Sequence, residues 1–169
     1  MSDDVAKRQY VVNMRPPAPR RSPEGDAFAA LAIGVLQLSG HLTAAGDALA
    51  KPVGQTSARW QVLAAARRGD MSVAQIARVL GVARQGVQRL ADVLEGEGLI
   101  AYADNPQHQR AKLVRLTAEG ANRLGIIEIA QAGWANKLGA AFTSAELDAA
   151  RAVMARVMEM LEAGEASRG

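Results

Sequence analysis

Cysteine is absent from the 169 residues of the sequence. Its absence excludes disulfide bonds, thiolate catalysis and cysteine-based redox sensing, and it fits a reducing cytoplasm. Aromatic residues make up only 4% of the chain while 49% of the residues are hydrophobic, which favours closely packed helices over an aromatic-rich β-sandwich. The N-terminal stretch MSDDVAKRQY lacks the apolar core of a signal peptide. We therefore expect a mainly helical, cytoplasmic protein.

Motifs that mark catalytic or metal centres are also missing. The chain has two histidines and none of the patterns GxSxG, HExxH, GxxxxGK or GxGxxG, which mark nucleophiles, zinc ligands and phosphate-binding loops. Ser39, His41 and Asp47 lie on one expected helix, and their spacing cannot form a catalytic triad without partners from elsewhere. We expect no enzymatic activity, no cofactor and no metal site.

The longest uncharged stretch, residues 27–46, is close to the length that spans a bilayer. It contains Gln37, Ser39, His41 and Thr43, whose polar groups are costly in hydrocarbon. Its apolar residues follow alternating steps of three and four: Phe28, Leu31, Val35, Leu38, Leu42, Ala45 and Leu49. This heptad stripe predicts a helix from about Asp26 to Ala50 that packs against another helix, in the same chain or in a second copy, and no membrane span.

The net charge of +3 is unevenly distributed along the chain. Residues 54–117 hold nine Lys and Arg against five Asp and Glu, whereas residues 118–169 hold five against seven. A basic middle between near-neutral or acidic ends suggests that the middle meets a polyanion.

Residues 1–25 are Pro-rich and carry five basic and three acidic side chains. They indicate a disordered arm, which is either a solvated tail or a segment that contacts phosphates.

Two further helices are predicted from their capping residues. Thr56 can cap a helix that runs to the turn at residues 69–70. Ser72 and Gln75 form a capping box that opens the next helix. Gly81 ends that helix, because glycine readily adopts the left-handed conformation of a tight turn.

A fourth helix begins after Val82. Ala77, Gly81 and Val87 supply the small residue, the turn glycine and the locking apolar residue of a helix-turn-helix. The apolar face of the fourth helix is Val87, Leu90, Ala91 and Leu94, and the opposite face carries Arg84, Gln85, Gln88 and Arg89. Arginine matches the two major-groove acceptors of guanine, and glutamine matches the donor and acceptor of adenine. This face therefore either reads bases or is merely a solvated surface.

A β-hairpin is expected directly after this helix. Residues 99–102 indicate a short strand, residues 104–106 a turn and residues 111–117 a return strand. The polar, basic segment PQHQRAK lies at the tip. A hairpin in this position is a wing, and Arg110 at its tip can enter the minor groove.

From about Gln55 to Gly120 the sequence resembles the winged helix-turn-helix of the MarR family of bacterial transcriptional regulators. The resemblance is carried by GQTSARWQVLAA, SVAQIARVLGVARQGVQRLADVLEGEGLI and NPQHQRAKLVRLTAEG. It implies a mainly α fold, a winged helix-turn-helix with a small β-hairpin wing, flanked by N- and C-terminal dimerisation helices. It also implies an obligate homodimer that represses pseudo-palindromic promoter sites in double-stranded DNA and is often released by a small organic ligand.

The sequence departs from the family pattern at three places. His108 stands where the family usually has an aspartate two residues before the wing arginine. Ala83 and Gly86 replace the Ser or Thr that the family often has at the start of the recognition helix and three residues later. The absence of cysteine excludes the thiol-based peroxide-sensing branch.

The expected DNA-binding residues lie on the recognition helix and the wing. They are Arg84, Gln85, Gln88, Arg89, His108, Arg110 and Lys112. His41 and Trp60 are candidates for an effector pocket, which in the family lies between the dimer helices and the winged domain. In the alternative interpretation, His41 is a histidine of the dimer interface and Trp60 is a tryptophan of the hydrophobic core.

The C-terminal segment repeats the heptad pattern. Thr117 caps a helix that runs to about Gly139, and Thr143 with Glu146 forms another capping box. The last helix carries the stripe Leu147, Ala150, Met154, Val157 and Leu161. We expect the two heptad helices to meet across a two-fold axis.

The chain therefore divides into four expected parts. They are the arm at residues 1–25, an N-terminal dimerisation helix at 26–53, the winged helix-turn-helix DNA-binding domain at 54–117, and a linker helix with the C-terminal dimerisation helix at 118–169. The expected partners are double-stranded DNA, a second copy of the chain and a small-molecule effector, with no membrane. The alternative function is a winged-helix protein-interaction module without specific DNA binding.

Overall fold

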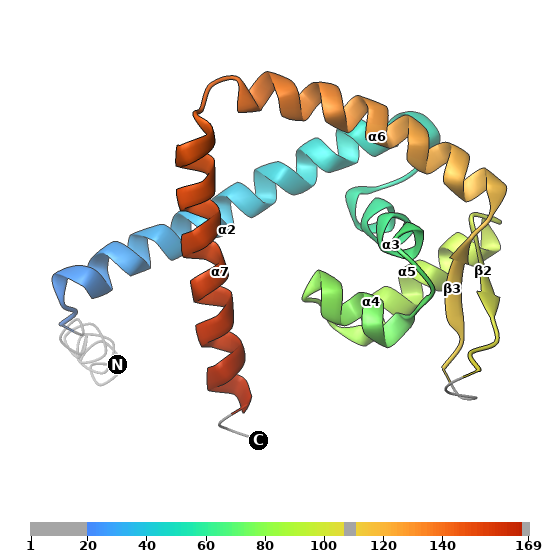
Figure 1. The fold of residues 1–169 in the computed structure, drawn as a ribbon, viewed down its shortest axis with the longest axis horizontal. Coiled ribbons are helices and arrows are strands. Elements are labelled where there is room, and N and C mark those ends of the chain that lie inside the picture. The colour runs from blue at the N-terminus through green and yellow to red at the C-terminus, as the bar shows by residue number, and fades with distance from the viewer. Residues whose placement is uncertain (1–19, 107–110, 167–169) are drawn as a thin grey trace, which may run out of the picture. The chain divides into compact units, whose positions relative to one another are not determined.

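The computed structural model describes residues 20–106 and 111–166 of the chain. The elements, in chain order, are α2 (Pro23–Ala50), η1 (Lys51–Val53), α3 (Ser57–Arg67), β1 (Met71–Ser72), α4 (Val73–Leu80), α5 (Arg84–Gly96), β2 (Ile100–Ala103), β3 (Leu113–Leu116), α6 (Ala118–Gly139) and α7 (Ser144–Ala166) (Figure 1). This order confirms the expected fold class, which is mainly helical with a small wing sheet. The chain forms two compact units, one up to Leu42 and one from Thr43 onward.

Helix α2 begins at Pro23, three residues before the predicted start at Asp26. The backbone N–H of Gly25 donates to Ser22 Oγ (3.1 Å), and a proline in the first turn lacks only an N–H that the helix would leave unpaired. The last three residues assigned to the arm at 1–25 are therefore helical. The rest of that segment, up to residue 19, lies outside the described residues.

The segment Pro23–Val53 is long and apolar enough to cross a membrane by length and composition alone. Its apolar stripe is exposed in the single chain, and Leu38 and Leu42 are 53% and 46% exposed. An exposed apolar stripe of this length needs a partner surface, because monomeric soluble proteins rarely leave one open to water. Length and composition alone would also fit a lipid bilayer, whereas the heptad spacing predicts another helix as the partner.

The caps predicted for α3 and α4 are confirmed. Thr56 Oγ1 accepts a hydrogen bond from the backbone N–H of Arg59 (3.3 Å). Ser72 Oγ accepts from the backbone N–H of Gln75 (3.4 Å), and the side chain of Gln75 accepts from the backbone N–H of Ser72 (2.8 Å). Gly81 closes α4 with φ at 65°, in the left-handed region where a side chain is strained. These local bonds fix where both helices begin and end.

A single hydrophobic core holds the winged domain together. Its buried members come from α3, α4, α5, the α5–β2 turn, β2, β3 and the first half of α6: Val62, Leu63, Ala65, Ala66, Val73, Ile76, Ala77, Val87, Ala91, Leu94, Leu99, Ile100, Val114 and Leu124. Helix α3 packs against α4, α5, α6 and β3. The apolar face predicted for α5 is therefore buried as expected, except that Leu90 is only partly buried.

The wing belongs to a three-stranded antiparallel sheet with the order β1-β3-β2. The first hairpin strand has the predicted length but begins one residue later, and the return strand is shorter than the predicted 111–117, with Ile100 opposite Leu116 and Ala103 opposite Leu113. The sequence did not predict β1, in which Met71 pairs with Val114. Two residues are too few to show the alternation that marks a strand.

Both C-terminal helices begin where their caps predict. Thr117 Oγ1 accepts from the backbone N–H of Gly120 (3.0 Å), and Thr143 Oγ1 accepts from that of Glu146 (3.3 Å). Leu124 and Ile127 of α6 are buried, whereas Leu138 near its end is exposed. The heptad stripe of α7 is exposed apart from the half-buried Val157.

Candidate nucleic-acid interface

Helix α5 is fixed at both ends against its neighbours. At its N-terminal end the turn after α4 is closed by the backbone N–H of Val82, which donates to the carbonyl of Ala77 (3.0 Å). At its C-terminal end Glu97 accepts from Arg59 Nη1 (2.8 Å), in the first turn of α3, and from Gln55 Nε2 (2.7 Å), just before that helix. These bonds and the packing of α5 against α3, α4 and β2 determine which side of the helix faces outward.

The buried residues of α5 determine which side chains face outward. Val87, Ala91 and Leu94 are fully buried. Arg84, Gln85 and Arg89 are exposed on the other side, and Gln88 is half-buried among them. Ala83, at the cap position, makes no side-chain hydrogen bond to the helix, as expected where a Ser or Thr is missing. The structure thus places the four predicted base-reading residues on one surface.

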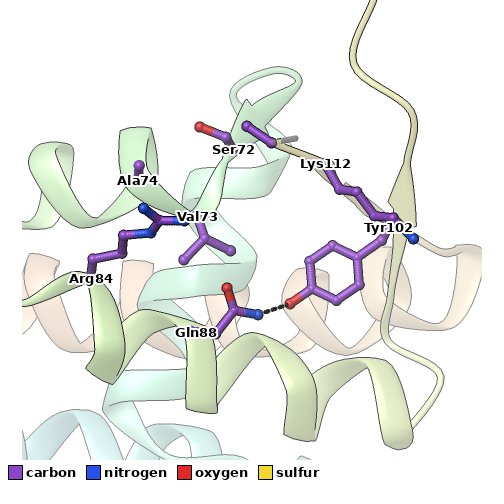
Figure 2. A pocket seen from close by; sticks show the side chains of 8 residues that line it. Ser72, Val73, Ala74, Arg84, Gln88, Tyr102 and Lys112 are labelled. Atoms are coloured by element: carbon purple, nitrogen blue, oxygen red, sulfur yellow. Dashed lines mark hydrogen bonds between the residues drawn. The ribbon is translucent and has the colours of Figure 1, made fainter. Parts of the chain in front are cut away.

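A pocket of about 400 Å³ opens between this face and the wing (Figure 2). Arg84 and Gln88 reach it from α5, and Tyr102 and Lys112 reach it from the wing side. Its remaining lining residues are Ser72, Val73 and Ala74 at the start of α4, and Ala111. The lining includes two cationic side chains and no carboxylate, so the pocket suits an anionic or hydrogen-bonding ligand such as the edge and backbone of a nucleic acid.

Gln88 belongs to a closed polar network beside this pocket. Its amide nitrogen Nε2 donates to Asp92 Oδ1 (2.8 Å) and to the hydroxyl of Tyr102 (2.8 Å). The Tyr102 hydroxyl in turn donates to Asp92 Oδ1 (2.9 Å). Burial, together with the hydrogen bond to Asp92, raises the pKa of Tyr102 to about 12. The two-bond contact with adenine expected from Gln88 would require the amide nitrogen that these bonds occupy.

Asp92 and Tyr102 are site residues that the sequence reasoning missed. Asp92 lies one turn after Gln88 on the same helix, and side chains at this spacing can contact each other. The hydrogen bond between Gln88 and Asp92 could therefore have been predicted from the sequence. Tyr102 had none, because its approach to α5 depends on how β2 packs beside that helix.

The base of the wing is held by an ion pair between Arg115 of β3 and Asp70. Arg115 Nε donates to Asp70 Oδ1 (2.9 Å), and its Nη2 contacts Asp70 Oδ2. This pair lowers the pKa of Asp70 and raises that of Arg115. Lys112 is exposed just before β3. The candidate contacts His108 and Arg110 lie outside the described residues, so their roles stay predictions.

A second pocket, of about 540 Å³, lies between α4 and the wing and includes Arg78 and Asn105 in its lining. The ligand candidates His41 and Trp60 line neither of the two pockets. His41 is exposed on α2, and Trp60 packs against the hydrophobic core, which favours the core interpretation of the tryptophan. Within the described residues no group of three or more metal-binding side chains comes together.

Comparisons with known proteins place this architecture in a family. Residues 54–111 match the sequence profile of the MarR family. The uncharacterized protein Rv2011c of Mycobacterium tuberculosis is 38% identical over 138 residues, which cover 82% of this chain and 96% of that protein. Among solved structures, the MarR family transcription regulator SP03579 superposes with a TM-score of 0.71 at 22% identity, over 82% of this chain and 93% of the other.

The transcriptional repressor CouR, solved bound to a 23-mer DNA duplex, has a TM-score of 0.69 at 21% identity, over 82% of this chain and 99% of the other. CouR of Rhodococcus jostii has also been solved with p-coumaroyl-CoA, with a TM-score of 0.67 at 20% identity, over 74% of this chain and 90% of the other. The chain belongs to the MarR family of winged helix-turn-helix transcriptional regulators, which are soluble DNA-binding proteins and not enzymes.

Proposed function

We propose that this chain acts in the cytoplasm as a homodimer that binds pseudo-palindromic promoter sites and represses transcription. The observation that carries the proposal is the outer face of α5, where Arg84, Gln85 and Arg89 are exposed beside the wing residue Lys112. Arginine and glutamine on a helix that fits the major groove can read base edges, while lysine and arginine attract phosphates. The geometry of the site thus supports sequence-specific binding.

The proposed dimer is supported by the apolar surface of the terminal helices. The exposed large apolar residues of α2 are Phe28, Leu31, Ile33, Val35, Leu36, Leu38 and Leu42, and those of α7 are Leu147, Val153, Met154, Met158, Met160 and Leu161. Pairing of these helices between two copies would remove this surface from water. A two-fold axis would also place two recognition helices in successive major grooves, roughly 34 to 36 Å apart.

Release by a small organic ligand is the part of the proposal that rests on a relative. CouR has been solved with p-coumaroyl-CoA as well as with DNA. In this chain His41 and Trp60 remain the candidate effector contacts. We expect an effector to lower the affinity of the chain for the operator. Screening a ligand library for compounds that release the bound operator DNA would detect such an effector.

The test of DNA binding is selection from a random duplex pool with the purified full chain. We expect an enriched inverted repeat whose half-sites are centred about one helical turn, 10 to 10.5 base pairs, apart. The control is the double variant Arg84→Ala/Arg89→Ala, which should enrich no sequence. Failure of the wild type to enrich any sequence would favour the protein-interaction module instead.

Repression is tested separately in cells. The selected site is placed beside the promoter of a reporter gene, with and without the chain. We expect reporter transcription to fall when the chain is present and the site is intact. A rise in transcription that depends on the same site would make the chain an activator.

A further inference from the structure

The chemistry of Asp92 determines the orientation of the Gln88 side chain. A carboxylate oxygen can only accept hydrogen bonds, so the end of the amide that lies 2.8 Å from Asp92 Oδ1 must be the nitrogen. The carbonyl oxygen then points away, and Figure 2 shows it turned from Tyr102 into the pocket. The opposite orientation would place two acceptor oxygens against each other.

Tyr102 fastens this arrangement to the wing. Its hydroxyl donates its only proton to Asp92 Oδ1 (2.9 Å), so it can only accept from Gln88 (2.8 Å). Because Tyr102 belongs to β2 and Gln88 to α5, the bond joins the wing sheet to the recognition helix. The Tyr102 hydroxyl, like Asp92, therefore accepts a hydrogen bond only if the amide nitrogen of Gln88 points toward it.

We propose that Asp92 and Tyr102 are positioning residues that leave only the carbonyl oxygen of Gln88 to meet DNA. Gln88 then accepts one hydrogen bond from an exocyclic amino group in the major groove, N4 of cytosine or N6 of adenine, and does not make the two-bond contact with adenine. The proposal rests on the DNA-binding function above and assigns the kind of base contact made at one position of the recognition helix.

The first experiment uses modified bases in the operator selected by the wild type. The base pair read by residue 88 is the one whose preference disappears in Gln88→Ala. Replacing its purine by the 7-deaza analogue, which lacks the N7 acceptor, should leave the affinity unchanged. The amino group is then removed from adenine if that base pair is A·T, or from cytosine if it is G·C. This removal should weaken binding about tenfold. Loss of affinity with the 7-deaza purine, or no loss without the amino group, would overturn the proposal.

The second experiment asks whether Tyr102 acts through Gln88. We expect Tyr102→Phe to lower the preference at that base pair about fivefold or more while affinity for random DNA stays the same. In the Gln88→Ala background the same substitution should have no further effect on preference, because the side chain it positions is gone. Asp92→Asn, whose amide can accept or donate, should likewise relax the preference.

A purely structural role of Tyr102 predicts a different pattern. Tyr102→Phe would then weaken binding to operator and random DNA alike, and its effect would add to that of Gln88→Ala. Additive effects, or an unchanged preference in Tyr102→Phe, would overturn the positioning role and leave the proposed function standing. A wild type that selects no sequence would overturn both.

Discussion

Arg84 combines exposure with a place in the pocket between α5 and the wing. It lies in the first turn of α5, where the missing cap at Ala83 leaves the backbone N–H groups without a side-chain partner. This residue and Gln88 are one turn apart on the same helix, so they can address neighbouring bases. At the scale of single residues, this part of the site therefore combines the exposed cation of Arg84 with the Gln88 amide, which its neighbours hold by hydrogen bonds.

Replacing Arg84 by alanine should cost about 1 to 3 kcal/mol of binding free energy at the operator and much less on random DNA. The reason is that a lost base contact reduces discrimination more than general attraction. Arg67→Ala, in α3, removes the same charge from a residue that is paired with Glu128 (2.6 Å) and is the matched control. Titrations of both DNAs by fluorescence anisotropy would measure the change. Equal losses on operator and random DNA would mean that Arg84 contacts only phosphates.

The raised pKa of Tyr102, about 12, makes a prediction about high pH. The folded chain holds the phenol proton more tightly than the unfolded chain, whose tyrosine titrates near 10. Its contribution to stability is therefore complete below about pH 10 and is lost as the pH rises toward 12. The chain has two tyrosines, so the difference between the tyrosinate absorbance of wild type and Tyr102→Phe isolates this group. A difference curve centred near pH 10 would contradict the closed network.

At the scale of elements, the contact between α6 and the α5–β2 turn sets the position of the wing. Thr117 Oγ1 donates to the carbonyl of Gly98 (2.7 Å), and the backbone N–H of Thr117 donates to the carbonyl of Leu99 (3.1 Å). Gly120, one turn further, is buried against the same carbonyl group. The sequence predicted the helix cap at Thr117 and gave no sign of the second role of this residue, because Gly98 and Leu99 reach it only in the folded chain.

Gly120→Ala should destabilise the fold. An added Cβ would overlap the carbonyl oxygen of Leu99 and lie 2.9 Å from its carbon, and this backbone cannot turn aside as a side chain could. We expect a loss of about 1 to 3 kcal/mol in the free energy of unfolding. Gly125→Ala, in the same helix, meets nothing within 4 Å and should instead gain about 0.5 to 1 kcal/mol. Urea unfolding at equal protein concentration compares them, and equal effects of the two substitutions would refute the close contact.

At the scale of the whole molecule, the exposed stripe on α2 raised two interpretations, a membrane span and a helix interface. Membership of the MarR family identifies the chain as a soluble regulator and so decides against the span. The remaining apolar surface of α2 and α7 needs a partner, and we propose a second copy of the chain.

Leu38→Glu or Leu42→Glu should break this dimer and abolish operator binding, although neither residue belongs to the proposed DNA surface. An unpaired charge in a buried seam costs several kcal/mol. Gln37→Glu adds the same charge to the same helix outside the stripe and should leave both properties unchanged. Sedimentation of the wild type and the three variants measures the assembly. A monomeric wild type, or charged variants that stay dimeric and bind normally, would place the interface elsewhere.

The local structure was determined by the sequence itself. The caps at Thr56, Ser72 and Thr117, the turn at Gly81 and the buried face of α5 all depend on residues a few positions apart, whose interactions form wherever the chain is helical. For the same reason the sequence sufficed to place Arg84, Gln85, Gln88 and Arg89 on one face.

The contacts between segments that lie far apart along the chain were decided only by the tertiary structure. Strand β1 exists because Met71 meets Val114. The second hydrogen bond of the Gln88 amide nitrogen depends on a hydroxyl that β2 brings to α5. Such contacts require the whole core to pack first, since no rule of spacing along the chain fixes which residues of separate elements meet. The sequence thus determined which side chains share the outer face of α5, and the packing of the wing against α5 decided which hydrogen bonds join Gln88 to the wing.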